Sequence, residues 1–435
     1  MSKETRQCSE VSLAKEMNEA KNKQIKEKGK ATRLRHKTLS CKVFTCKIDK
    51  SHLSKTSSEF FRMVFLEAKW FVNDILESGD IFHSNYKKKN PTVLKDGKTP
   101  EERKIVFLPA QVRQSLVEKL KQSVLALARM KKLGMRVGRL RFKKKISCLP
   151  LNQAGVTFKI VDKTHIHIQG CKGNLRVSGL SQIPEDAEIA KADLVNRAGN
   201  YFIKITCYVP KKQRVKTGKS VGLDFGITTS VTTSDGQKFK IAIEEPKRLR
   251  KLQRGKFCRR VKHSKNWIKT SGKVAVEYER VKNQKKDLGN KLVSKLVKEY
   301  DIIACQDENV KGWHSGLFGR QVQASCLKGI ISDLQHKSET FLQVDRWYPS
   351  TKTCHNPECK HKQEVALSER VFVCQNCGAT EDRDIHSAIN ILNEGLRLMR
   401  NAEDVKSPVE LTSSTDVAFW NNGKLLTMNQ EAIAL

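Results

Sequence analysis

The spacing of apolar residues predicts two long amphipathic helices in the first third of the chain. Between residues 56 and 79, apolar side chains recur every three or four positions, and Thr56 with Glu59 matches a capping box at the start of this helix. The same periodicity predicts a second helix over residues 109–133. We interpret residues 55–134 as one helical insertion.

On both sides of this insertion the period changes to two, which predicts β-strands. Residues 41–48 form the first expected strand, and in residues 138–145 Leu140 and Phe142 alternate with basic residues. Such alternation places apolar side chains on one strand face and cations on the other. More strands are expected over residues 156–162, 165–170, 174–179 and 200–210, at the spacing of a small barrel or antiparallel sheet. We expect the cationic face to bind nucleic acid through Arg139, Arg141 and Lys143.

The second half of the chain predicts an α/β layer fold of the RNase H type. A strand that contains Asp224 is followed by another strand and the turn signal Asp235-Gly236, as in a hairpin. Gly222 and Gly226 flank Asp224, and we expect them to leave room for cations and a nucleic-acid backbone. The pattern then predicts two helices, a strand, a helix and a strand, over residues 246–299, 301–308, 320–335 and 340–348.

Charge indicates the kind of partner. The 435 residues contain 83 Lys and Arg against 46 Asp and Glu, a net charge of +37, which predicts a polyanionic partner such as nucleic acid. In the most basic segment, residues 246–299, 19 Lys and Arg face 4 Asp and Glu. This excess repels itself unless phosphates neutralise it. We therefore expect nucleic-acid contacts from Arg248, Arg250, Arg259, Arg260 and Lys262.

Residues 1–40 are polar and basic, so we expect a flexible arm that orders only on nucleic acid, and we expect residues 401–435 to form a disordered tail. No apolar stretch approaches the ~20 residues of a membrane span, and the N-terminus lacks the apolar core of a signal peptide. These features predict a soluble cytoplasmic protein without a membrane partner. They also indicate that the 13 cysteines are reduced thiols and metal ligands rather than disulfides.

Three acidic residues lie at the ends of predicted strands or turns. Asp224 is in VGLDFGITTS, Glu308 ends DIIACQDE, and Asp384 is in EDRDIHSAIN. Carboxylates that converge from such positions can hold two Mg²⁺ or Mn²⁺ ions for in-line cleavage of a phosphodiester. The three residues are thus candidate catalytic and metal-binding residues of an RNase H-like, or RuvC-like, nuclease centre.

Two cysteine pairs predict one structural zinc ion. Four residues lie between Cys354 and Cys359, two lie between Cys374 and Cys377, and fourteen residues separate the pairs. Thiolates at such spacings form a tetrahedral zinc site on two knuckles. Either neighbouring histidine, His355 or His361, is an alternative to Cys359 as a ligand.

The pair His165-Ile-His167 raises another possibility, because a His-hydrophobe-His strand carries the metal in transposases that nick single strands with a tyrosine nucleophile. Such an enzyme needs a catalytic tyrosine on a helix, and the available residues, Tyr278 and Tyr300, lie in segments that are better explained otherwise. We therefore disfavour this alternative.

The motifs from GLDFGITTSVTTSDG through HSKNW, DENVKGW and VDRWYPSTKTC to CQNCGATEDRDIHSAINIL resemble TnpB, the transposon-encoded RNA-guided DNA endonuclease, and the compact type V CRISPR effectors. The resemblance covers residues 217–400 and extends more weakly toward residue 41. It implies a β-barrel wedge domain with a helical recognition insertion, followed by a RuvC nuclease domain with a zinc-ribbon insertion. The boundaries that we expect are wedge 41–54 and 135–216, recognition 55–134, RuvC 217–350 and 383–400, and zinc-bearing target-binding domain 351–382.

The resemblance also implies roles for individual residues. Asp224 matches the first RuvC acid, and Asp384 matches the acid of the pattern Asp-x-Asn-Ala, where this chain has His386-Ser387. Many members read Ile-Glu-Asp-Leu-Asn-Val near the second acid, which leaves either Glu308 or Gln306 at that position. We favour Glu308, because both residues lie on the same strand face and a shift of two residues still delivers a carboxylate.

The function that follows is RNA-guided cleavage of DNA next to a short flanking motif read as duplex, in the cytosol or nucleoid of a prokaryote. Its partners are a guide RNA and double-stranded and single-stranded target DNA, and a monomer is favoured. An alternative is an RNA-guided silencer that binds without cutting, which loses acids of the triad. A zinc-ribbon transcription factor is a third class, but it leaves the three acids unexplained. Guide, motif and target are not determined by the sequence.

Overall fold

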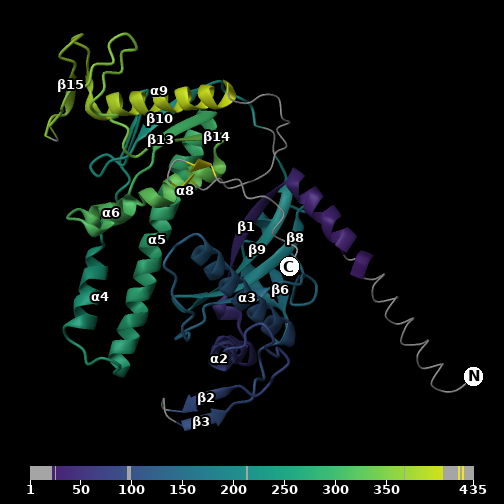
Figure 1. The fold of residues 1–435 in the computed structure, drawn as a ribbon. Helices are drawn as coiled ribbons and strands as arrows, with labels where there is room; N and C mark the ends of the chain where they lie inside the picture. The colour runs from purple at the N-terminus through teal and green to yellow at the C-terminus, as the bar shows by residue number, and fades with distance from the viewer. Residues whose placement is uncertain are drawn as a thin grey trace, which may run out of the picture. The chain divides into compact units, whose positions relative to one another are not determined.

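The computed structural model describes residues 22–24, 26–95, 99–211, 214–366, 368–404, 420–421 and 424–425. The chain folds into two compact units (Figure 1). The first contains residues up to Val215 and the segment Arg248–Glu279, and the second contains Lys216–Lys247 and the residues from Arg280 onward.

A seven-stranded antiparallel sheet forms the frame of the first unit. Its strand order is β4-β8-β9-β1-β7-β6-β5. The alternation expected for half-buried strands is clearest in β6, where Ile166 and Ile168 are buried and His165 and His167 are partly exposed. The strands are β1 (Leu39–Ile48), β4 (Cys148–Leu151), β5 (Phe158–Ile160), β6 (His165–Ile168), β7 (Leu175–Ser178), β8 (Glu188–Arg197) and β9 (Asn200–Pro210).

Two helices cover the core of this sheet, as the apolar periodicity predicts. Helix α2 (Lys55–Ser78) and helix α3 (Ala110–Lys132) bury their apolar faces in the same cluster as the sheet. The predicted capping box at Thr56 is wrong: the N-cap is Ser54, whose hydroxyl accepts a hydrogen bond from the backbone N–H of Ser57. A short hairpin of β2 (Thr92–Lys95) and β3 (Thr99–Glu102) lies between the helices in sequence.

The strand predicted over residues 138–145 is absent from the described structure, where these residues form an extended loop. Phe142 is 61% exposed, so the alternation of apolar and basic residues has no sheet face to bury it. The loop is held by Asn73 of α2, whose side chain exchanges two hydrogen bonds with the backbone of Lys143. Residues 26–38, which we expected in a flexible arm, are helical.

The basic segment forms the predicted pair of helices, α4 (Lys247–Phe257) and α5 (Lys265–Glu299), with a bend between them (Figure 1). They are joined side by side, because Arg248 forms an ion pair with Glu277 at 3.0 Å and Gln253 donates a hydrogen bond to Tyr278. Basic side chains occupy the other exposed positions of α4 except the last, where Phe257 is 71% exposed.

A five-stranded mixed sheet forms the frame of the second unit, with the strand order β12-β11-β10-β13-β14. Strand β11 pairs in antiparallel orientation with β10 and β12, whereas β13 pairs in parallel orientation with β10 and β14. The bounds are β10 (Ser220–Asp224), β11 (Val231–Thr233), β12 (Lys238–Phe239), β13 (Ile302–Gln306) and β14 (Thr340–Val344).

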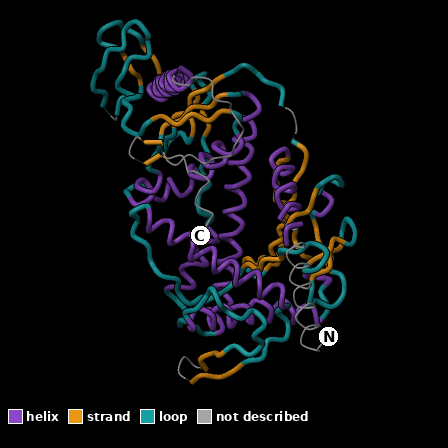
Figure 2. Tube along the Cα trace, turned by 45° about the vertical axis from the view of Figure 1, so that its right-hand side comes forward, coloured by secondary structure: helices purple, strands orange, loops and turns teal. Residues whose placement is uncertain are grey.

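Helices cover both faces of this second sheet. Apolar residues of α5 and α8 (Leu327–Lys337) pack with Ile303 and Cys305 on one face, and α9 (Arg383–Asp404) packs with Ala304 on the other. Both views show α9 beside the strands of this sheet (Figures 1 and 2). The α/β layers expected for this half of the chain are therefore present.

Gly222 explains how closely α9 approaches the sheet. A Cβ atom on Gly222 would lie 2.0 Å from the carbonyl oxygen of Ala388 in α9. The expectation that Gly222 leaves room for cations and nucleic acid is therefore wrong, because a helix backbone fills that space. Gly226 lies in a tight turn, where a Cβ would be 2.7 Å from the carbonyl oxygen of Thr229.

The remaining elements of the second unit are short. The helix predicted over residues 320–335 is two helices, α7 (Gly319–Ser325) and α8, because Cys326 between them adopts a left-handed backbone with φ 49°. Helix α6 (Val310–Ser315) precedes them. The segment with the two cysteine pairs, residues 351–382, is called the zinc-knuckle segment below and contains a hairpin of β15 (Val371–Val373) and β16 (Thr380–Asp382). Two further strands are β17 (Trp420–Asn421) and β18 (Lys424–Leu425).

Most of the predicted arm and tail lies outside the described residues, namely 1–21 and 25 of the arm and 405–419, 422–423 and 426–435 of the tail. Helix α9 continues to Asp404, four residues past the expected end of the nuclease domain. Among the helices that the structure describes, none combines the length and apolar character of a membrane span.

Candidate active site and zinc-binding cysteines

The three predicted acids come from three different elements of the second unit. Asp224 is the last residue of β10, Glu308 follows the end of β13 by two residues, and Asp384 is in the first turn of α9. Because β10 and β13 are parallel neighbours, with Leu223 paired to Cys305, their carboxyl ends meet at one edge of the sheet. The fold thus brings Asp224 and Glu308 to the same edge.

Asp224 and Asp384 line one cleft of ≈ 360 Å³. The turn after β10 forms one wall, and residues of α6 and of the zinc-knuckle segment form the others. The sequence predicted neither the aromatic nor the basic residues of this cleft, since their spacing along the chain matches no metal or nuclease motif. These additional lining residues include Trp313, Thr351, Arg370 and Arg383.

Electrostatics link all three acids. The pKa of Asp224 is raised to about 8, first by burial and then by the negative charges of Asp384 and Glu308. Burial also raises the pKa of Glu308 to about 7, with a further contribution from Asp307 that Arg346 opposes. Repulsion between carboxylates that share a buried region is relieved by bound cations or protons.

The three carboxylates are nevertheless not gathered around a single point. Among the described residues, only the four cysteines of the zinc motif form a group of three or more metal ligands that all lie within 4.8 Å of one another. The described structure therefore does not place the three acids as ligands of one ion, and their joint metal site stays a prediction.

Gln306, the alternative second acid, has a structural role. Its side-chain amide nitrogen lies within 3.1 Å of the backbone carbonyl oxygens of Asp345 and Arg346 and 2.8 Å from that of Tyr348. Its side-chain oxygen accepts a hydrogen bond from the hydroxyl of Ser350 at 3.2 Å. A carboxylate cannot donate to three carbonyl groups. The amide therefore suits this buried position and anchors the chain between β14 and the first knuckle.

A row of hydroxyl groups connects this anchor to Asp224. Ser350 lies 3.0 Å from the hydroxyl of Ser387, which in turn is 3.3 Å from a carboxylate oxygen of Asp224. Ser387 has one hydroxyl hydrogen, so it donates either to Ser350 or to Asp224. This position departs from the family pattern expected from the sequence, where alanine is commoner, and it supplies a hydrogen-bond donor beside the acid.

His386, the other departure from that pattern, joins α9 to the zinc knuckle. Its ring is fully buried and stacks on Phe372 with centroids 3.7 Å apart. One ring nitrogen lies 2.8 Å from the carbonyl oxygen of Thr353, and the other lies 2.9 Å from the ring of His355. Burial lowers the pKa of His386 to about 4, so the neutral ring is the stable form. The amide of Asn390 also donates to Thr353.

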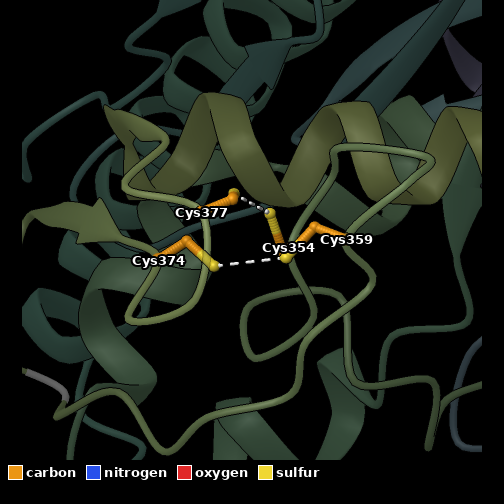
Figure 3. Close-up of side chains that lie close together, drawn as sticks. All are labelled: Cys354, Cys359, Cys374 and Cys377. Atoms are coloured by element: carbon orange, nitrogen blue, oxygen red, sulfur yellow. Dashed lines mark hydrogen bonds between the residues drawn. The ribbon is translucent and has the colours of Figure 1, made fainter.

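The four predicted cysteines converge in the described structure (Figure 3). The Sγ atoms of Cys354 and Cys377 are 3.6 Å apart, as are those of Cys359 and Cys374. Zinc bound by four thiolates at about 2.3 Å gives sulfur–sulfur edges of about 3.8 Å, so the spacing fits this ion. His355 does not replace Cys359, because its ring is directed to His386.

Polar groups around Cys359 and Cys374 favour thiolates, whereas burial raises the pKa of Cys354 to about 12. Backbone N–H donation, first from Cys377, lowers the pKa of Cys374 to about 6. The pKa of Cys359 is lowered first by a hydrogen bond from the side-chain amide of Asn376, whose nitrogen is 3.3 Å from the sulfur. Thiolate is the form that binds metal, so this environment is suited to a cation.

The predicted nucleic-acid contacts all lie in the first unit, on the extended loop, on α4 or in the bend after it. Arg139, Arg141 and Lys143 are exposed on the extended loop rather than on a strand. Arg248 is paired with Glu277, and Arg260 donates to the carbonyl oxygen of Asn266 at 2.7 Å. The other candidates, Arg250, Arg259 and Lys262, are exposed on α4 or in the bend after it.

The alternative of a tyrosine transposase finds no support in this geometry. His165 is bound to Asp162, and His167 lies 3.3 Å from the carbonyl oxygen of Gly173. Tyr300 is buried and donates to Asp235, which together with burial raises its pKa, so its hydroxyl is a poor nucleophile.

Two family models match parts of the chain. Residues 203–314 match the family described as "Probable transposase", and residues 330–391 match "Cas12f1-like, TNB domain". The second match contains the four cysteines and Asp384, and the first contains Asp224 and Glu308.

Curated relatives carry names of the same kind. A "Putative RNA-guided DNA endonuclease" of Streptomyces pristinaespiralis is 32% identical over 49% of this chain and 55% of its own length. A protein of Escherichia coli (strain K12) with the same description is 30% identical over 50% of this chain and 61% of its own length. A "TnpB-like protein" of Acanthamoeba polyphaga mimivirus is 27% identical over 45% of this chain and 41% of its own length. The chain thus spans about half the length of the curated relatives that it matches.

Among solved structures, a Cas12f1 complex with single guide RNA and target DNA aligns with 14% identity and a TM-score of 0.43, over 78% of this chain and 79% of that chain. The resemblance predicted from the motifs is confirmed by the family models and the curated relatives: the chain is related to the TnpB-like and Cas12f1-like proteins.

Proposed function

We propose that the chain is an RNA-guided DNA endonuclease that cleaves guide-complementary DNA by divalent-metal-dependent hydrolysis of phosphodiester bonds. The observation that carries this proposal is the electrostatic coupling of Asp224 to Asp384 and Glu308, at one edge of a mixed sheet. Relatives named as RNA-guided DNA endonucleases supply the substrate class and the guide.

In this proposal Asp224, Glu308 and Asp384 hold two Mg²⁺ or Mn²⁺ ions. The ions, when bound, activate the attacking water and stabilise the leaving oxygen. Asp224 is the central ligand, because its charge is affected by both other acids and because Ser387 holds one of its oxygens. The adjacent Arg383, whose side chain is 3.8 Å from Asp384, offsets part of the negative charge.

The other parts of the chain are assigned to nucleic-acid binding. The sheet of the first unit corresponds to the wedge domain, residues 55–134 to the recognition domain, and residues 351–382 to a zinc-bearing domain that engages target DNA. The net charge of +37 and the exposed cations of the extended loop and α4 support a guide RNA and target DNA as partners. The mixed sheet covered by helices supports a RuvC-type assignment for the second unit.

The alternative function is an RNA-guided silencer that binds without cutting. It follows if the second acid of the triad is replaced by Gln306. The hydrogen bonds of Gln306 argue against this alternative, because its amide nitrogen binds backbone carbonyl groups. The negative charge of Glu308, in contrast, contributes to the raised pKa of Asp224.

Replacement of single acids tests the proposal. Asp224→Ala and Asp384→Ala should each abolish cleavage of guided target DNA in Mg²⁺, while guided binding is retained, because affinity comes from phosphate contacts spread over the chain. Asp333→Ala is the matched control, since Asp333 is an acid of α8 that pairs with Lys337 away from the cleft. Cleavage by purified Asp384→Ala protein at the native rate would refute the assignment.

A further inference from the structure

The tetrapeptide Asp-Lys-Ser/Thr-His occurs twice in the first unit, at residues 49–52 and 162–165. Both copies fold in the same way. The carboxylate of Asp49 accepts hydrogen bonds from the backbone N–H (3.0 Å) and hydroxyl (2.7 Å) of Ser51 and binds the Nδ1 atom of His52 (2.9 Å).

In the second copy, Asp162 accepts from the backbone N–H (2.6 Å) and hydroxyl (2.8 Å) of Thr164, and its other oxygen lies 2.9 Å from Nδ1 of His165. Each carboxylate therefore holds an imidazole by Nδ1, which leaves Nε2 as the nitrogen that is directed away from the turn.

The sheet brings residues of both copies to the lining of one cavity of ≈ 360 Å³. His165 of β6 is the cross-strand partner of Arg176 in β7. The first copy follows β1, and the backbone N–H of Asp49 donates to the carbonyl oxygen of Arg176 at 2.9 Å. The cavity is lined by His52, Thr164, His165, Asn174 and Arg176.

Arg176 is a neighbour of both histidines, as a hydrogen-bond partner of His52 and the cross-strand partner of His165. One of its terminal nitrogens is 2.9 Å from Nε2 of His52, so it donates to that ring. Within the described part of the chain, no carboxylate lies within ion-pair distance of Arg176, and four of its five N–H groups remain for other acceptors. The carboxylates of Asp49 and Asp162 accept hydrogen bonds from residues of their own turns. For Asp162, the bonds from the backbone and hydroxyl of Thr164 lower the pKa to about 2.

Divalent metal is the first ligand to consider, because metal-binding histidines commonly donate their other nitrogen to a carboxylate. However, Nε2 of His52 accepts from Arg176, so the lone pair that a metal needs is occupied, and a guanidinium cation stands at the site. The cavity instead presents the guanidinium of Arg176 and the amide of Asn174 as donors, and Nε2 of His165 donates as well when that ring is protonated and its Nδ1–H is held by Asp162.

We infer that this cavity binds a phosphate group, held by Arg176 and assisted by His165 and Asn174. Arginine is suited to phosphate because its planar fork matches two oxygens, and the hydrogen bond to His52 fixes the orientation of that fork. That the phosphate belongs to an RNA strand rests on the proposed function. The phosphate site itself rests only on the cavity.

Histidine labelling of the full chain tests the site. Diethyl pyrocarbonate modifies the free imidazole nitrogen, and peptide mass spectrometry measures the rate at each histidine. Inorganic phosphate, compared with chloride of equal ionic strength, should slow labelling of His165 at least threefold. His83 is an internal control, because Asp80 binds its Nδ1 atom with the same spacing but outside the cavity. Its labelling rate should not change.

Two variants sharpen the test. Arg176→Gln should remove the protection of His165 by phosphate, whereas Lys159→Gln, which removes one charge from the exposed position on neighbouring β5, should preserve it. Arg176→Lys keeps the charge and loses the fork, so it should retain only part of the protection. Circular dichroism and unchanged labelling of His83 establish that each variant is folded.

A second arm uses single-stranded RNA of mixed sequence in place of phosphate. Protection of His165 but not His83 supports an RNA phosphate, whereas protection by phosphate alone keeps the site and overturns its assignment to RNA. Equal labelling of His165 in phosphate and chloride, or protection by zinc but not by phosphate, overturns the inference. Neither arm measures DNA cleavage, so failure of the proposed nuclease activity is a separate result.

Discussion

At the scale of single residues, the structure gives different roles to Gln306 and Glu308, which the sequence left as alternatives for the second acid near Asp224. Gln306 and Glu308 are two positions apart, yet the first is bound by the backbone of the loop after β14 and the second contributes charge to the acidic cluster. Three backbone carbonyl oxygens surround the side-chain amide of Gln306, which is why an amide suits that position. Chemical identity and location together decide the role of each.

Substitution of Glu308 should therefore lower cleavage, whereas substitution of Gln306 should lower stability. Under the proposed function, Glu308→Gln removes one negative charge from a site that would hold two cations, so cleavage should fall roughly 10²-fold or more with guided binding unchanged. Plasmid cleavage and target binding, measured on the same preparation, test this expectation. An active native enzyme that is indifferent to Glu308→Gln would show that the second acid lies elsewhere.

Gln306→Glu should give no gain of cleavage and should destabilise the protein. The new carboxylate would face three carbonyl oxygens without a hydrogen to donate, and each unmet buried polar group costs about 1–3 kcal/mol. Thermal unfolding of both variants against the native protein tests this difference. Cleavage that appears only in Gln306→Glu would support the silencer alternative for the native chain.

The raised pKa of Asp224 predicts a pH dependence of stability. The folded protein keeps a proton on Asp224 up to about pH 8, whereas the unfolded chain loses it near pH 4, so without metal the folded state loses relative stability as the pH rises through this interval. Asp224→Asn cannot ionise and should be more stable than the native protein at pH 8, with a difference that shrinks toward pH 4. Unfolding in chelator across this range measures it, and a constant difference would contradict the assigned pKa.

At the scale of elements, α9 is the component that organises the candidate active site. It carries Asp384, rests directly on β10 at Gly222, and is bonded to the zinc knuckle through His386 and Asn390. A displacement of this helix would therefore move one acid relative to Asp224, which is fixed in the sheet.

Gly222→Ala tests this contact between helix and sheet. The added Cβ would meet the backbone of α9 at 2.0 Å, so the helix must shift, at a cost of about 1–3 kcal/mol. Both the melting temperature and the cleavage rate should fall. Gly329→Ala is the matched control, because a Cβ at that position in α8 meets no atom within 4 Å, and alanine favours a helix by about 1 kcal/mol. A tolerated Gly222→Ala would show that the approach is looser than described.

At the scale of the whole molecule, the two units differ in what stabilises them. The large sheet of the first unit and its two covering helices share one apolar core, whereas the knuckle segment of the second unit has only a small cluster around Cys354, Phe372 and Cys374. We expect a segment with so little apolar contact to depend on a bound zinc ion for most of its folding free energy.

One zinc ion per chain is therefore expected, and Cys377→Ser should abolish its binding. The knuckle should unfold and release the contacts of Phe372 and Thr353 with His386, so both target binding and cleavage should decrease. The mixed sheet, which has its own core, should remain folded. Elemental analysis measures the zinc, and hydrogen exchange resolves the two segments. Less than about half a zinc per native chain, without exposure to chelator, would count against the site.

The sequence by itself determined the features that depend on local periodicity and on residue chemistry. The helices α2, α3, α4 and α5 followed from apolar positions three and four residues apart, and most strands followed from alternation. The four cysteines were predicted as a group because spacing along the chain limits how thiolates can meet. Their positions at the ends of strands and turns pointed to the three acids, and the family resemblance matched Asp224 and Asp384. The joint participation of the acids in a metal site stays a prediction.

Only the tertiary structure decided the features that depend on contacts between distant segments. Apolar and basic residues alternate over 138–145 as in a strand, but this segment pairs with no strand, because β4 forms the edge of the sheet. Gly222 faces a helix some 160 residues away in the chain, and Gln306 faces the loop after β14. The two Asp-Lys-Ser/Thr-His turns meet across paired strands. Neither periodicity nor composition records such contacts, since both describe each segment's own environment and not the neighbour that folding brings to it.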